Sequence, residues 1–166
     1  VLAAPVRRGA VYASQAAATI AGAAVLAGLL MAGTWTAVAF GPWAGTIDPN
    51  RFLPAAGNVF GLMVCMAGLA SLCSAAVNHR SHAIGIMCGF YVISLLAKLV
   101  GKLSDRFAGF GWLSLFNAYE PQRLVSGEAD SWLLLARYDA VLLGVGLAAY
   151  VAGAVIFARR DLPAPL

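Results

Sequence analysis

The residues whose chemistry suits ion binding or proton transfer are few, and two of them end an apolar run. Lys98 and Lys102 are spaced by one helical turn near the end of that run. Ionisable side chains at membrane depth often mark ion or proton pathways. Lysines near the end of a membrane helix instead extend their ammonium groups to the interface. We expect the second behaviour for both lysines.

A second polar group follows in the sequence Glu120-Pro121-Gln122-Arg123. Glutamate and arginine three residues apart share one face of a helix and can pair there. Proline is well placed in the first turn of a helix. We therefore predict that a short external helix begins here. The same segment supplies a candidate external gate, made of Tyr119, Glu120, Pro121 and Arg123.

The spacing of the histidines and cysteines gives little support for a metal site or a disulfide. His79 and His82 flank Arg80 in a short polar turn, but two imidazoles without a carboxylate or thiolate nearby make an incomplete metal site. The cysteines are odd in number, lack CxxC spacing and lie within apolar runs, at Cys65, Cys73 and Cys88. We interpret them as packing residues and predict neither a disulfide nor a metal site.

Catalytic signatures are absent from the sequence, which has no GxSxG, no HExxH and no GxxxxGK[ST] phosphate loop. Asp139 is close to Arg137 and Asp130 along the chain, and we expect these residues to form an external charge network rather than a proton relay. An enzyme working inside the membrane would need a buried acidic residue or histidine, which the expected spans lack. We predict no enzymatic activity and no cofactor.

The elements that position these residues are membrane helices. The 166 residues are 61% hydrophobic and only 11% charged, against about 25% charged in a soluble domain. The formal net charge of +4 does not indicate nucleic-acid binding, because the arginines flank apolar segments, where they meet lipid headgroups. The composition predicts an integral membrane protein with membrane lipids as partners.

Four apolar runs each reach the roughly 20 residues that cross a bilayer. They predict an all-α polytopic bundle, a single transmembrane domain over residues 1–166, with spans at about 16–40, 53–77, 83–103 and 140–158. Small residues recur in the runs and predict close packing of helix backbones; they include Gly22, Gly28, Gly33, Gly57, Gly61, Gly85, Gly89, Ala149 and Gly153. The connection over 104–137 is rich in aromatic residues, and we expect it to be external and to form short interfacial or re-entrant helices.

Four spans place both termini on one side of the membrane. Lysines and arginines number five on the side of the termini and six on the other, so their count alone does not decide the orientation. The basic residues that flank spans and short loops favour cytoplasmic termini. We expect a multi-pass protein of the cell inner (plasma) membrane with both termini in the cytoplasm.

Three segments in this layout resemble the later part of an ABC-2-type transporter permease. The opening APVRRGAVYASQAAATIAG is similar to the cytoplasmic segment before the third span of that family. The stretch WLSLFNAYEPQRLVSG is similar to its external re-entrant segment before the last span, and AVIFARRDLPAP to its cytoplasmic end. The family has two further spans upstream. Because the chain starts at Val1 rather than Met, we expect a processed or truncated product, or a start codon that was read literally. The two upstream spans are then missing because the chain is a fragment, or they lie on another chain.

The resemblance implies a subunit of an ATP-driven exporter, partnered by an ATP-binding cassette ATPase and by a second permease copy or a homologous half. It also implies that the cytoplasmic segment with Pro5, Arg7 and Arg8, together with Arg80, transmits the motion of the ATPase. Arg7 and Arg8 equally fit headgroup anchoring of the first span. The alternative function is a non-catalytic scaffold or assembly subunit of a larger membrane complex.

Overall fold

The computed structural model describes residues 8–42, 44–103, 114–126 and 131–159, and all regular structure in these ranges is helical. The described residues form four long helices and three short helical elements. The long helices are α1 (Arg8–Phe40), α2 (Leu53–Ala76), α3 (Arg80–Leu103) and α6 (Ser131–Arg159). The short elements are η1 (Pro49–Phe52), η3 (Leu115–Ala118) and α5 (Pro121–Val125).

Each long helix is long and apolar enough to cross a membrane. The shortest two have 24 residues, which corresponds to about 36 Å against roughly 30 Å of hydrocarbon. The prediction of an all-α polytopic bundle with four candidate spans is confirmed. The last helix begins at Ser131, before the expected span start at Ala140, so part of the expected 104–137 connection belongs to α6.

The core of the bundle is the pair formed by α2 and α6. In their apolar windows 33% and 28% of residues are buried, against 6% in both α1 and α3. The two helices pack closely at Gly68 and Gly146: a Cβ added to Gly68 would lie 3.0 Å from the carbonyl carbon of Gly146. Without a hydrophobic force between helices in lipid, such backbone contact is a main source of helix association.

Helix α1 packs against this pair through two polar contacts at the end where α1 begins. Ser71 Oγ donates a hydrogen bond to Tyr12 Oη at 2.9 Å, and the hydroxyls of Thr19 and Tyr150 lie 2.8 Å apart. The Tyr12 ring lies over Gly153, where a larger residue would collide with it. These contacts link α1 to both α2 and α6.

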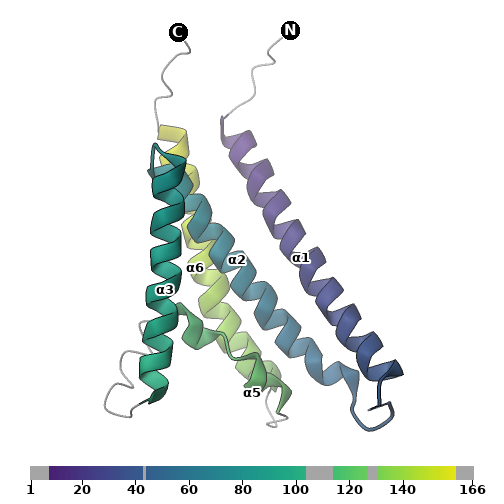
Figure 1. Ribbon diagram of the computed structural model, residues 1–166. Coiled ribbons are helices and arrows are strands. Elements are labelled where there is room, and N and C mark those ends of the chain that lie inside the picture. Colours follow the sequence, from purple (N-terminus) through teal and green to yellow (C-terminus); the bar gives the residue numbers. More distant parts are fainter. Residues whose placement is uncertain (1–7, 43, 104–113, 127–130, 160–166) are drawn as a thin grey trace.

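The beginning of α1 and the end of α6 lie at the same end of the bundle, and α1 and α3 lie on opposite sides of the α2–α6 pair (Figure 1). At the other end, Asp48 caps η1 by accepting a hydrogen bond from the Asn50 backbone N–H at 2.9 Å. Gly45 has a φ of +80°, a conformation that glycine adopts without strain. The chain thereby turns from α1 into α2.

Candidate functional site

Residues 114–126, which we call the 114–126 segment, fold back between the long helices at the end opposite to the start of α1. The segment contains η3 and α5, and it contacts α2, α3 and α6. Phe116 and Leu124 anchor it with buried side chains, the latter only 2% exposed. The predicted short helix at Pro121 is confirmed, with proline in its first turn. Residues 104–113 and 127–130 of the expected connection lie outside the described residues.

Asn58 on α2 is the polar centre of this site and is completely buried. Its Nδ2 donates hydrogen bonds to the Ala118 carbonyl at 3.0 Å and to Asp139 Oδ1 at 3.1 Å. Its Oδ1 accepts from the Glu120 backbone N–H at 3.2 Å. One amide side chain therefore ties the 114–126 segment to α2 and α6 together.

The partner of Asp139 in the structure differs from the charged residues that the sequence suggested. Its carboxylate accepts a hydrogen bond from Asn58 and packs over Gly61, where an added Cβ would lie 2.7 Å from Oδ1. Among the described residues no ion pair joins it to Arg137, and Asp130 lies outside them. Helix α6 begins at Ser131 and is long and apolar enough to cross a membrane, so it includes Asp139, one residue before the expected span start at Ala140.

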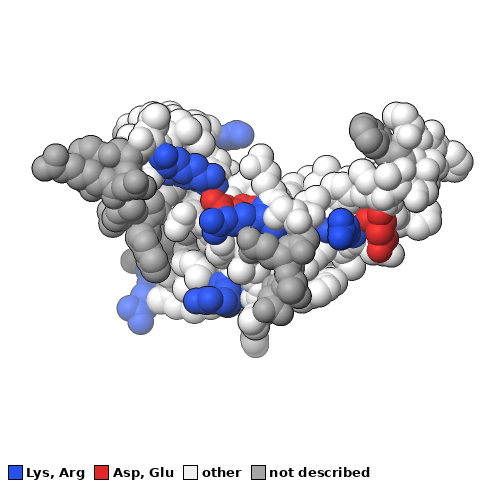
Figure 2. All heavy atoms as spheres, turned by 90° about the horizontal axis from the view of Figure 1, so that it is seen from below, with Lys and Arg blue, Asp and Glu red and all other residues white. Residues whose placement is uncertain are grey.

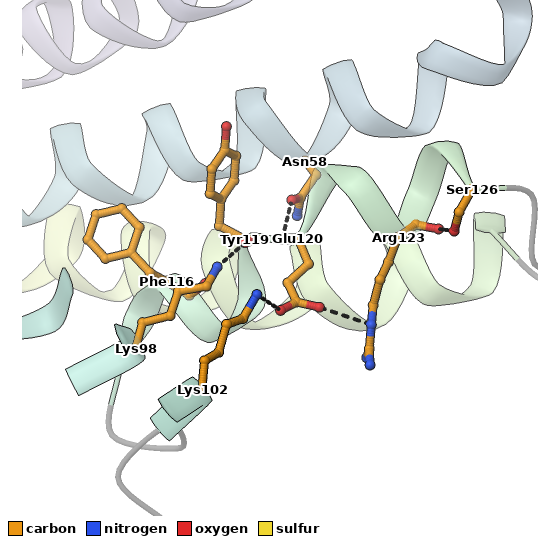
Figure 3. Close-up of polar contacts among 8 residues, drawn as sticks. All are labelled: Asn58, Lys98, Lys102, Phe116, Tyr119, Glu120, Arg123 and Ser126. Atoms are coloured by element: carbon orange, nitrogen blue, oxygen red, sulfur yellow. Dashed lines mark hydrogen bonds and ion pairs between the residues drawn. The ribbon is translucent and has the colours of Figure 1, made fainter. Parts of the chain in front are cut away.

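Lys98 also differs from the expectation of a side chain extended to the interface. Its ammonium group donates hydrogen bonds to the carbonyls of Phe116 at 2.8 Å and Tyr119 at 2.6 Å, as Figure 3 shows. These are the carbonyls at the two ends of the turn around η3, and the cation therefore closes that turn onto α3. Beside it, Ser114 Oγ donates to the Ser94 carbonyl at 2.6 Å.

Glu120 joins the segment to two cations at its exposed edge. Its carboxylate lies 3.3 Å from Lys102 Nζ and 3.2 Å from Arg123 Nε, and its side chain is only 13% exposed. The predicted pairing of Glu120 with Arg123 is confirmed. Figure 2 shows basic and acidic side chains gathered across this end of the molecule. Lys102 is exposed, as a lysine that reaches the interface would be.

The two lysines allow a matched test of this geometry. We expect Lys98→Met to release the 114–126 segment. The part-buried Tyr119 carbonyl then loses the donor described for it, at a cost of about 1–3 kcal/mol, and the Phe116 carbonyl keeps only its bond from the Tyr119 backbone N–H. Lys102→Met removes one ion pair whose lysine is exposed, and Glu120 keeps its pair with Arg123, so we expect a loss of about 0–1 kcal/mol. Hydrogen exchange of peptides over 114–126 should accelerate strongly in the first variant and little in the second. Equal acceleration in both would contradict the anchoring role of Lys98.

The beginning of α5 separates two hollows of different character. A hollow of about 560 Å³ between α1, α2 and α5 is almost wholly apolar. A second hollow, of about 520 Å³, is lined by the charged side chains of Lys98, Lys102, Glu120 and Arg123. Tyr119, Pro121 and Gln122 line both hollows, so the segment forms a wall between them.

Two of the residues expected to couple to an ATPase are described, and both lie far from this wall. Arg8 is the first residue of α1 and Arg80 the first of α3, both at the end of the bundle where α1 begins (Figure 1). Pro5 and Arg7 lie outside the described residues. The structure thus brings the four gate candidates together and places the described coupling candidates at the opposite end.

Asn58 is the functional candidate that sequence reasoning missed. A signal existed, because Asn58 is the one amide side chain in the uncharged run from Leu53 to Val77. A buried amide is costly unless its hydrogen bonds are satisfied, so it indicates a specific partner. The identity of that partner could not be read from the sequence, since Ala118, Glu120 and Asp139 are 60 or more residues away.

The described site is a network of ion pairs and hydrogen bonds that holds the 114–126 segment to α2, α3 and α6. Among the described residues no group of three or more histidine, cysteine, aspartate and glutamate side chains could hold a metal ion. Comparison of the chain with protein-family models, with curated proteins and with solved structures finds no match. The functional conclusion therefore depends on the residues and geometry of this chain.

Proposed function

We propose that the chain is a transmembrane permease subunit of an ATP-binding cassette exporter of the ABC-2 type, and that it moves substrate with energy from a separate ATPase. The observation that carries the proposal is the wall formed by the 114–126 segment between an apolar and a charged hollow. Such a wall suits a gate at the external mouth of a transport path. Two features of the sequence add support. Three of its segments resemble parts of the ABC-2 family in the expected order, and it has no phosphate loop.

Helix α3 provides the mechanical link that the proposal needs. Its first residue is Arg80, and 18 residues later Lys98 holds the carbonyls of Phe116 and Tyr119. Because few of its residues are buried, α3 is held by fewer contacts than α2 or α6. A displacement of α3 caused by a partner at the Arg80 end would be carried along about 27 Å of helix to the 114–126 segment.

The proposed orientation follows from this mechanism. An ATPase acts in the cytoplasm, so the end of the bundle with Arg8 and Arg80 faces the cytoplasm and the 114–126 segment faces outside. The membrane is the cell inner (plasma) membrane. A second permease copy or homologous half completes the transport path, as the resemblance to the ABC-2 family implies.

Co-purification tests the partner. We expect the Arg7→Glu/Arg8→Glu variant to lose an ATP-binding subunit from pull-downs of native membranes, and Arg80→Glu to weaken its recovery, because reversed charge repels an acidic partner surface. Arg51→Glu, at the opposite end, is the matched control and should recover the subunit normally. Wild-type recovery with the double variant would show that Arg7 and Arg8 only anchor the first helix.

A membrane scaffold is the second candidate function, and the exposure of α3 favours it. The helix leaves large apolar side chains uncovered on several faces, among them Ile84, Ile93 and Leu96. Such a surface suits a larger membrane complex as well as lipid. The same pull-down distinguishes the candidates: a large membrane complex without any ATP-binding protein would replace the exporter proposal by the scaffold.

A further inference from the structure

A third hollow lies between α2 and α3. One end is near the end of the bundle where α1 begins, and the other is at Tyr91, whose ring packs against Phe116 of the 114–126 segment. Its volume is about 800 Å³, within the range of about 300–1,000 Å³ that ligand pockets occupy. Ser74, Asn78 and Arg80 line one end of it. Met66 on α2 and Tyr91 on α3 line it as well, two to three helical turns further along their helices. The hollow is therefore an amphipathic groove, polar at its mouth and mostly apolar along its length.

The dimensions of this groove match one leaflet of a bilayer. Arg80 and Tyr91 are 11 residues apart on α3, a rise of about 16 Å. Half of a hydrocarbon core of about 30 Å is about 15 Å. The polar mouth then lies at the depth of the headgroups when the deep end lies near the middle of the membrane.

The charge at the mouth selects the kind of headgroup. Arg80 is exposed, and no described ion pair engages it. The acidic residues that the structure describes are all elsewhere: Asp48 caps η1, Glu120 belongs to the 114–126 segment and Asp139 is bonded to Asn58. The guanidinium group therefore lacks a described protein anion and suits a phosphate, which it can bind through two parallel hydrogen bonds.

We infer that the groove between α2 and α3 holds one anionic phospholipid, with its phosphate at Arg80 and an acyl chain lying along Ala70 and Met87 toward Tyr91. The inference depends on the membrane embedding of the helices and not on the exporter proposal. A lipid held here fills the space where α2 and α3 do not touch. The lipid phosphate would hold α3 against the bundle at its Arg80 end, whereas the hydrogen bonds of Lys98 to the 114–126 segment hold its other end.

Native mass spectrometry of the detergent-purified chain tests the headgroup. With dioleoyl phosphatidylglycerol and dioleoyl phosphatidylcholine offered in equal amounts, we expect one bound lipid and a preference of about fivefold for the anionic one, as one cation at a phosphate supplies. Arg80→Gln should remove this preference. The matched control is Arg159→Gln, an exposed arginine at the same end that does not line the groove, and it should retain the preference.

The acyl chain is tested separately. Ala70 is exposed and lines the groove midway, so Ala70→Phe should fill it and reduce retention of both lipids, while size-exclusion chromatography reports whether the variant is folded. In the wild-type chain, a phosphatidylglycerol with a diazirine near the end of its acyl chain should crosslink close to Met66 or Tyr91. Equal loss of preference in both arginine variants would overturn the inference. So would crosslinks confined to other helices, or a dimer that forms through this face and excludes lipid.

Discussion

Replacing Gly146 by alanine is expected to push α2 and α6 apart and to destabilise the folded protein by about 1–3 kcal/mol or more. A Cβ at this position would lie 2.7 Å from the Cα and 3.0 Å from the backbone nitrogen of Cys65. Neither atom can move without shifting the whole of α2. Because these two helices form the core of the bundle, the strain cannot be relieved locally. Unfolding in mixed detergent, followed by circular dichroism, measures the loss.

Gly144 provides the matched control on the same helix. An added Cβ there meets nothing within 4 Å, so Gly144→Ala should be neutral or slightly stabilising, as expected for alanine in place of glycine in a helix. The same chemical change two residues apart should thus have opposite signs. Similar stabilities of the two variants would contradict the backbone contact between Gly146 and Cys65.

Replacing Asn58 by alanine is expected to have an effect of similar or larger size, about 3 kcal/mol or more. The substitution leaves the Glu120 N–H, the Ala118 carbonyl and the Asp139 carboxylate each without this partner. Each unsatisfied part-buried group costs about 1–3 kcal/mol. The 114–126 segment should detach from α2, which limited proteolysis of the segment and the unfolding midpoint both report.

Asn117 lies in the same segment but is exposed, and Asn117→Ala should leave both the midpoint and the protease resistance almost unchanged. A second variant separates the contributions of the partners. If Asn58 stabilises mainly by satisfying Asp139, then Asp139→Ala should recover part of the loss in the double variant, because the carboxylate is then removed with its donor. No recovery would instead assign the stabilisation to the Glu120 and Ala118 backbone groups.

Apolar run length and the local chemistry of Glu120–Arg123 are determined by the sequence. A run of more than 20 apolar residues forms a helix in lipid because every backbone group must be hydrogen-bonded internally. This rule needs no knowledge of neighbours, and the four candidate spans follow from it. The ion pair of Glu120 with Arg123 is equally local, since both residues lie within one turn of the same short helix.

The small-residue pattern shows where such reasoning stops. Gly22, Gly28, Gly33, Gly85 and Gly89 belong to the small residues predicted to mark close helix contact, yet an added Cβ at any of them meets nothing within 4 Å. Gly57, Gly61, Gly68, Gly146 and Gly153 do face close neighbours. Periodicity places small residues on one face of a helix, but it does not determine which face meets which helix.

The roles of the polar residues were likewise decided by tertiary structure. Lys98 and Lys102 are alike in sequence context, but α3 presents Lys98 to two carbonyls and leaves Lys102 exposed at the edge. Asp139 pairs with Asn58, 81 residues away, instead of its neighbour Arg137. The sequence by itself determined that the chain forms apolar helices with a polar connection, because those properties depend on residues close together along the chain. Only the packing of the helices and of the 114–126 segment decided which polar groups meet, because hydrogen bonds and ion pairs require separations of a few ångströms between residues that are distant in sequence.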